Sequence, residues 1–175
     1  MLARLGDFLR MTLDNSGAEQ VTLQQELEFL RCYLEIERVR FHDRLTINID
    51  VDSEALEARV PNLILQPIVE NAIRHGIVRR LGSGLIEIVG KREGDRLRLR
   101  VVDNGPGISP NSAFDTGVRE GLGLANTRAR LEQLYGSDYR FELVDANGGG
   151  LQVRVEIPFE VTAAGEPSRE RAAVT

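Results

Sequence analysis

The sequence lacks several features that define common protein classes. It contains a single cysteine, Cys32, so no internal disulfide can form, as is typical of proteins from a reducing compartment. No stretch approaches the ~20 consecutive apolar residues of a membrane-spanning helix, and the start has no signal-peptide pattern. A Gly-Lys-Ser or Gly-Lys-Thr tripeptide is absent, which excludes a P-loop nucleotide site. We therefore expect a cytoplasmic location, with any membrane anchor outside this chain.

Size and charge indicate how many domains the chain forms and which partners are excluded. The 175 residues are 42% hydrophobic, which is enough for one domain with its own core. The formal net charge of −5 argues against a nucleic-acid partner. Arg96, Arg98 and Arg100 would form a basic row on one face of a strand, which we interpret as a solvated face.

The first 43 residues are expected to form a helical hairpin. Residues 2–13 place apolar side chains at helical spacing. A second helix begins after Thr22, which forms a capping-box pattern with Gln25. Its apolar stripe consists of Leu23, Leu27, Leu30, Leu34 and Ile36. The stripe needs cover, either from the rest of the chain or from a second copy.

From residue 44 the pattern changes to alternating strands and helices. The expected elements are strands over 45–51, 85–90, 96–102, 139–145 and 151–157 and helices over 62–78 and 122–135. Strands with one apolar face predict an α+β fold, here a two-layer α/β sandwich behind the N-terminal helical hairpin. The domain would cover residues 44–159, and the charged, aperiodic residues 160–175 are expected to be a disordered tail.

An acidic residue and a glycine-rich turn end the strand over 96–102. Residues 103–107 read Asp-Asn-Gly-Pro-Gly. Because side chains alternate along a strand, Asp103 lies on the same face as Leu99 and Val101, which should be buried. A buried carboxylate needs a partner. An adenine amino group would satisfy Asp103, and so would the backbone of its own tight turn.

The helix over 65–76 has a polar face opposite its apolar one. At 100° per residue, Leu65, Val69 and Ile73 point one way, whereas Asn71, Arg74 and His75 point nearly opposite. Asparagine is disfavoured inside helices, so Asn71 is either a surface residue or has a ligand. An amide oxygen is a suitable ligand for Mg²⁺ that carries nucleotide phosphates.

A long irregular loop and a glycine-rich helix start follow the Asp103 turn. Residues 104–120 show no period and are rich in Gly, Pro, Ser and Asn, which is typical of a functional loop. Residues 121–126 read Gly-Leu-Gly-Leu-Ala-Asn where a helix begins, and backbone N–H groups at a helix start can hold phosphate. We interpret the loop as a nucleotide lid beside a phosphate-binding helix start.

The order of these segments closely resembles the ATP-binding domain, with the Bergerat fold, of the GHKL superfamily. That superfamily unites DNA gyrase, the MutL repair proteins and sensor histidine kinases. Four segments are similar in sequence to the LytS-type sensor histidine kinases: residues 23–30, 33–37, 40–41 and 66–72. The resemblance covers residues 2–159.

The resemblance assigns roles to matching positions. It implies that Asn71 is the ligand of Mg²⁺ and that Asp103 accepts the adenine amino group of ATP. Arg74 and His75 stand where the family has polar residues that face the nucleotide. The other implied ATP-binding positions shape the adenine pocket and the phosphate loop: Gly105, Gly107, Gly121, Leu122, Gly123 and Leu124. No catalytic residue is assigned.

The resemblance also implies an activity. The chain would be the catalytic part of a two-component sensor histidine kinase, which binds Mg-ATP and transfers the γ-phosphate to a histidine. That histidine would lie on an upstream phospho-acceptor helix of the full-length kinase, which is expected to be membrane-anchored. The phosphate would then pass to an Asp of a response regulator. Residues 1–43 would be the end of the dimerisation helices, through which a homodimer could form.

Three positions depart from the family pattern. The Asn-Pro-His-Phe type segment with the phospho-acceptor histidine is absent, so we expect no autophosphorylation by this chain alone. Pro67 stands where the hydrolases of the superfamily carry a general-base Glu, which favours transfer to a protein nucleophile over rapid ATP hydrolysis. The Gly-Thr of the last family segment is Gly150-Leu151 here.

Two other functions fit parts of the pattern. A protein-serine kinase of the anti-sigma-factor type belongs to the same superfamily, but it would not need the helix that contains residues 33–37. A non-catalytic nucleotide-binding module would use the helical hairpin for dimerisation, and its nucleotide would only bias conformation.

Overall fold

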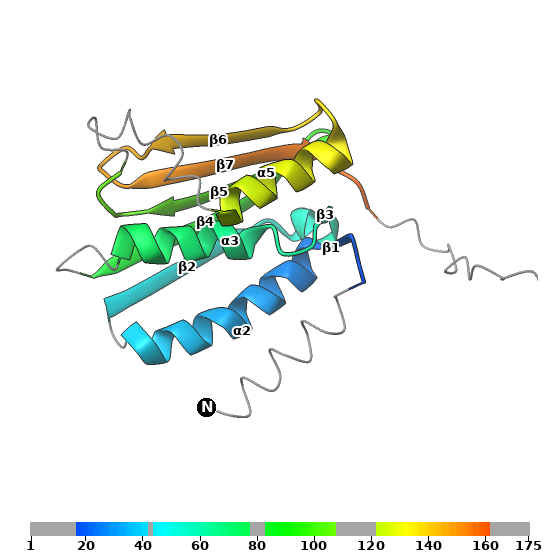
Figure 1. Cartoon of the computed structure of the whole chain (residues 1–175). Coiled ribbons are helices and arrows are strands. Elements are labelled where there is room, and N and C mark those ends of the chain that lie inside the picture. The colour runs from blue at the N-terminus through cyan, green and yellow to red at the C-terminus, as the bar shows by residue number, and fades with distance from the viewer. Residues whose placement is uncertain (1–16, 42–43, 78–82, 108–121, 162–175) are drawn as a thin grey trace, which may run out of the picture.

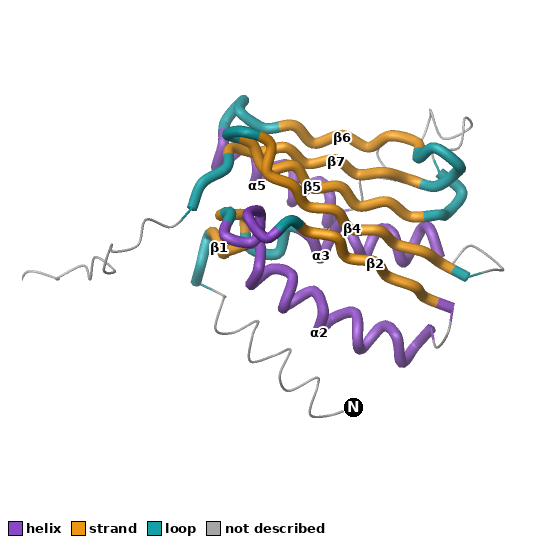
Figure 2. Tube along the Cα trace, turned by 180° about the vertical axis from the view of Figure 1, so that it is seen from behind, coloured by secondary structure: helices purple, strands orange, loops and turns teal. Residues whose placement is uncertain are grey.

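The fold is a five-stranded sheet with all its long helices on one face. The computed structural model describes residues 17–41, 44–77, 83–107 and 122–161, with the backbone alone for residues 75–77. The helices lie in front of the sheet in Figure 1, and the view from behind shows the other face uncovered by any described helix (Figure 2). This arrangement confirms the expected α+β, two-layer architecture.

The sheet has the strand order β2-β4-β5-β7-β6. Its strands are β2 (Leu45–Val51), β4 (Gly84–Glu93), β5 (Arg96–Asp103), β6 (Arg140–Asp145) and β7 (Leu151–Pro158). All five match strands expected from the sequence. Strands β2 and β4 pair in parallel, whereas the other neighbours are antiparallel. The parallel pair requires a crossover, and the chain between these strands forms the helical layer that carries Asn71.

The crossover differs from its expected form. Instead of one helix over 62–78, an α-helix α3 (Leu65–Asn71) continues as a π-helix η3 (Ala72–Ile77). A 3₁₀-helix η2 (Ser53–Glu57) and a small sheet of β1 (Gln20–Thr22) and β3 (Arg59–Pro61) were not predicted, because elements this short have no measurable hydrophobic period.

The helices α2 (Leu23–Phe41) and α5 (Leu122–Tyr135) have the ends that the sequence indicated. The Thr22 N–H donates to Oε1 of Gln25 at 3.0 Å, and the Gln25 N–H donates to Oγ1 of Thr22 at 3.2 Å. This reciprocal pair confirms the capping box. Helix α5 is followed by Gly136 at φ 59°, the left-handed conformation of a C-terminal glycine cap.

The apolar stripe of α2 is covered by this chain itself as far as Leu34, whereas Ile36 at its end is only half-buried. Its buried residues Leu23, Leu27, Leu30 and Leu34 belong to one hydrophobic cluster with the inner faces of β4, β5 and β7. The first half of the expected hairpin, residues 2–13, and the tail from residue 162 lie outside the described residues. Along the described ranges, no helix combines the length and apolar character needed to cross a membrane.

Candidate functional site

Asp103 is buried at the end of β5, on the face covered by the helices. The residue is only 5% exposed. Oδ1 accepts a hydrogen bond from the Gly105 N–H at 2.7 Å and another from the Leu151 N–H at 3.3 Å. The expected burial is therefore confirmed, and the carboxylate also caps its own turn. One oxygen ties β5 to the start of β7.

Asn104 fixes the same turn to a third strand. Its Oδ1 accepts from the Leu85 N–H at 2.9 Å, its Nδ2 donates to the Ser83 carbonyl at 3.2 Å, and its backbone N–H donates to the Leu85 carbonyl at 3.2 Å. No role for Asn104 was predicted from the sequence. Together, Asp103 and Asn104 hold the turn between β4 and β7, so its orientation is set by the sheet.

Glycines allow the backbone to approach this turn closely. A Cβ at Gly150, where φ is 103°, would lie 1.8 Å from the carbonyl oxygen of Asp103. At Gly107, where φ is 69°, a Cβ would lie 2.8 Å from Oδ1 of Asp145 and 2.9 Å from the Gly150 carbonyl oxygen. Gly105 is buried within the turn. The loop between β6 and β7 thus packs backbone against backbone on the Asp103 turn.

Asn71 is the last residue of α3, at the point where the helix widens into the π-helix. The Ala72 N–H is shared between the carbonyls of Ile68 and Val69, and the π-helix begins at this residue. Such π segments occur frequently at functional sites. The π-helix packs against β4 and β5, which brings Asn71 toward the strand that ends at Asp103. The Asn71 side chain is half-buried and forms no hydrogen bond with a described residue.

The apolar face expected for this helix is present, and one residue of the expected polar face is exposed. Leu65, Val69 and Ile73 are buried, whereas Arg74 is exposed. The side chain of His75 lies outside the described residues. Within the described ranges, no group of three His, Cys, Asp or Glu residues could hold a metal ion. A hard cation here would take Asn71 and otherwise phosphate oxygens and water, which is the usual coordination of Mg²⁺ in nucleotide sites.

The start of α5 meets α3 at a glycine. A Cβ at Gly123 would lie 3.3 Å from Cβ of Pro67, so Gly123 permits the close approach of the two helices. Leu124 is buried in the core, and Leu122 is 86% exposed. Gly121 lies outside the described residues. Gly123 therefore has a packing role in addition to the phosphate contact that the resemblance implies.

Glu26 holds the start of α3 and was not predicted as a functional residue. It is 1% exposed, and its two carboxylate oxygens accept from the Leu63 and Leu65 N–H groups, each at 2.8 Å. Leu63 has φ 58°, an uncommon conformation for leucine. An anion is favoured at a helix N-terminus because the unpaired N–H groups and the helix dipole point toward it. Arg130 of α5 donates to the Asn62 carbonyl in the same turn.

A signal for Glu26 exists in the sequence. It lies on the apolar stripe of α2, directly before Leu27 and three residues after Leu23. A carboxylate buried at such a position is costly unless it accepts hydrogen bonds. Burial raises the pKa of Glu26 above its ordinary value, although the hydrogen bonds from Leu65 and Leu63 oppose that rise. The carboxylate is therefore a fixed structural joint among three helices.

Comparison with protein families gives two matches. The family model of the histidine kinase-, DNA gyrase B-, and HSP90-like ATPases matches residues 57–161, and a histidine kinase model matches residues 1–45.

Individual relatives are similar over most of this chain. The sensor histidine kinase BtsS of Escherichia coli K12 is 34% identical over 155 residues, 89% of this chain and 27% of that protein. The sensor protein LytS of Staphylococcus haemolyticus is 33% identical over 144 residues, 78% of this chain and 25% of that protein. YwpD of Bacillus subtilis is 35% identical, over 86% of this chain and 56% of that protein. The chain thus spans about a quarter to about a half of these relatives.

Solved structures agree on the fold. The catalytic domain of histidine kinase ThkA superposes with a TM-score of 0.63 at 21% identity, over 80% of this chain and 94% of that domain. The histidine kinase domain of the E. coli osmosensor EnvZ gives a TM-score of 0.54 at 25% identity, over 87% of this chain and 95% of that domain. The expected ATP-binding fold is confirmed.

Two neighbouring glycines test the packing of the Asp103 turn. Gly149 and Gly150 both have positive φ, but a Cβ at Gly149 would meet nothing within 4 Å. We expect Gly149→Ala to lower the free energy of unfolding by about 1–3 kcal/mol through backbone strain alone. Gly150→Ala should cost at least about 2 kcal/mol more, because its Cβ overlaps the Asp103 carbonyl. Urea unfolding of both variants measures the difference, and equal losses would contradict the packing described.

The pH dependence of stability tests the state of Glu26. The unfolded chain releases this proton near pH 4.5, whereas the folded chain keeps it until its raised pKa is passed. The contribution of Glu26 to the free energy of unfolding is therefore highest below pH 4.5 and falls as the pH rises through the folded pKa. Glu26→Gln lacks this titration, so the free energy of the parent minus that of the variant should fall across this range.

Glu26→Ala provides the matched comparison. It should show the same pH profile as Glu26→Gln, displaced to lower stability by about 1–3 kcal/mol, because the Gln oxygen still accepts from one of the two buried N–H groups and Ala accepts from neither. Urea unfolding between about pH 4 and about pH 7 records all three profiles. Parallel profiles for the parent and Glu26→Gln would show that the carboxylate does not titrate as stated.

Proposed function

The chain belongs to the histidine kinase-, DNA gyrase B- and HSP90-like ATPase family, and we propose that it is the ATP-binding catalytic part of a sensor histidine kinase. The observation that carries the proposal is the buried, sheet-fixed carboxylate of Asp103, at the end of a strand that packs against the π-helix following Asn71. The similarity to BtsS and LytS favours a kinase over the other activities of the family.

Asp103 accepts the adenine amino group in this proposal. Its burial supports the role, because a hydrogen bond in a site of low dielectric discriminates strongly between a donor and an acceptor. The hydrogen bonds from Gly105 and Leu151 keep the carboxylate in one orientation, so little side-chain entropy is lost when adenine binds. Gly105 and Gly107 shape the adenine pocket by keeping the turn compact, Gly107 through its close approach to the Gly150 carbonyl.

The phosphates lie toward α3 and the start of α5. Asn71 would hold Mg²⁺ through its amide oxygen, and the bound metal would supply positive charge for the transferred phosphoryl group. Residues 121–124 hold the phosphates through backbone N–H groups at the helix start, where the dipole favours anions. Arg74, which is exposed, supplies a positive group for the phosphates, and His75 is the second polar residue that the resemblance assigns to the nucleotide.

The acceptor of the phosphoryl group is a protein side chain. Pro67, one turn before Asn71, carries no base that could activate water, and its ring packs on Gly123. The nearest carboxylate along the helix, Glu70, is held by Nε2 of Gln66 at 2.8 Å. In the longer, membrane-anchored kinase, the acceptor is a histidine on the upstream helix, and the phosphate then passes to a response regulator. Residues 1–43 form the end of the dimerisation helices of that protein.

A reaction in trans tests this proposal. The chain is incubated with Mg²⁺, radiolabelled ATP and an upstream segment of a LytS-type relative that contains the acceptor histidine. We expect label that is lost in acid and kept in alkali, as for phosphohistidine. Asn71→Ala should reduce labelling at least about tenfold, because the metal loses its protein ligand. Asn48→Ala is the control, because Asn48 is exposed on the edge strand β2, and this variant should give as much labelled histidine as the parent.

Other outcomes of the same reaction point elsewhere. ATP binding without any labelled histidine would indicate the non-catalytic module, and acid-stable label on serine would indicate a protein-serine kinase. Either result would overturn the proposed activity while leaving the family assignment intact.

A further inference from the structure

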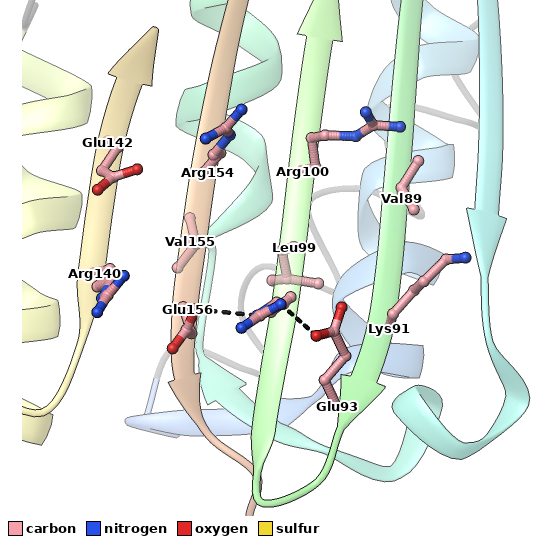
Figure 3. A pocket seen from close by; sticks show the side chains of 11 residues that line it. Val89, Lys91, Glu93, Leu99, Arg100, Arg140, Glu142, Arg154, Val155 and Glu156 are labelled. Atoms are coloured by element: carbon pink, nitrogen blue, oxygen red, sulfur yellow. Dashed lines mark hydrogen bonds and ion pairs between the residues drawn. The ribbon is translucent and has the colours of Figure 1, made fainter.

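The sheet face opposite the helices carries a concentration of positive charge. A hollow of about 420 Å³ lies across β4, β5, β7 and β6 on this face (Figure 3). Its charged lining contains five cations, which we call the open-face basic cluster: Lys91, Arg98, Arg100, Arg140 and Arg154. Three carboxylates, Glu93, Glu142 and Glu156, lie among them (Figure 3). The lining of this hollow therefore has an excess of positive charge on a chain whose formal net charge is −5.

The strand register places like charges directly opposite each other. Lys91 of β4 faces Arg98 of β5, and Arg100 of β5 faces Arg154 of β7. Directly opposed side chains have Cβ atoms about 4.5–5.5 Å apart, and like charges at that distance destabilise a sheet. Folding alone would favour opposite signs at these positions, so the pattern points to a role outside the fold.

Ion pairs neutralise only part of the cluster. Arg98 bonds to Glu156, with Nε and Oε2 3.0 Å apart, and also to Glu93 (Figure 3). By contrast, Lys91, Arg100 and Arg140 form no ion pair with any residue in the described ranges, and all three are exposed. The unneutralised cations are therefore available to an anionic partner.

We propose that the open-face basic cluster binds a net-acidic surface of another protein. An anionic membrane or a nucleic acid presents negative charge throughout, and Glu93, Glu142 and Glu156 would oppose it. A protein can place a basic side chain against each Glu and acidic side chains against the arginines. Val89 lies half-buried in the hollow and adds apolar area, which a protein partner can also cover.

This surface is separate from the nucleotide site. Asp103 belongs to the inner face of β5, whereas Arg98 and Arg100 belong to its outer face. The partner and ATP can therefore bind at the same time, and the two proposals are testable independently.

A charge-removal pair tests the proposal. Arg100→Thr combined with Arg154→Thr removes two positive charges from the face, and threonine suits strands. Arg31→Gln combined with Arg38→Gln removes the same charge from exposed positions of α2. The probe is a fluorescent peptide of Glu-Glu-Lys repeats, which carries both signs with a negative excess. Fluorescence anisotropy at low salt gives its dissociation constant for the parent and both variants, and circular dichroism checks that each variant is folded.

We expect the parent to bind the peptide, the open-face variant to bind about tenfold more weakly, and the α2 variant to bind like the parent. The open-face variant should keep the parent's affinity for Mg-ATP and, with one like-charge pair removed, should not be less stable. No peptide binding by the parent, or equal losses in both variants, would overturn the proposal. So would stronger binding to phosphatidylserine vesicles or duplex DNA than to the peptide.

Discussion

The carboxylate of Glu26 is the joint on which the helical layer depends. It is contributed by α2, accepts both of its hydrogen bonds at the start of α3, and lies next to the turn that Arg130 of α5 also contacts. A buried anion is costly unless it is fully bonded, and here the partial positive charge of a helix start offsets part of that cost, so the pKa of Glu26 stays raised. Because α3 ends at Asn71, the same joint fixes where the polar end of that helix points.

The sheet supplies the second fixed wall of the site. Asp103 and Asn104 bond to β7 and β4, and the glycine loop before Leu151 packs directly on the Asp103 backbone. The carboxylate is thereby held before any ligand arrives, which is the condition for selective recognition of one amino group on a base. In our account, the adenine lies at the sheet wall, and the metal and phosphates lie toward the helical wall.

Much of this architecture could be predicted from local patterns. The alternation along β5 indicated both the strand and the inward direction of Asp103, and the helix expected over 122–135 has the same bounds as α5. The capping box of Thr22 and Gln25 could also be predicted, since both of its hydrogen bonds form within four consecutive residues. These features share one property, namely that the cause lies within a few residues of the effect.

Features that depend on distant partners could not be predicted. The parallel pairing of β2 and β4, the three-residue strands β1 and β3, and the role of Gly150 depend on segments that the fold alone brings together. The π-helix after Asn71 leaves no mark in a hydrophobic period, because the same residues also fit an α-helix. Glu26 was the exception, because an acidic residue on an apolar stripe is visible in the sequence, although its partners at Leu63 and Leu65 are not.

The most direct measurement is calorimetric titration of Mg-ATP into the parent and into Asp103→Asn. The asparagine keeps an oxygen for the Gly105 and Leu151 N–H groups, so the turn is retained, but its amide nitrogen would face the adenine amino group as a second donor. We predict binding by the parent and a loss of at least about tenfold in the variant, as expected for an unpaired buried donor. Equal affinities, or no binding by a folded parent chain, would contradict the assignment of this carboxylate to adenine.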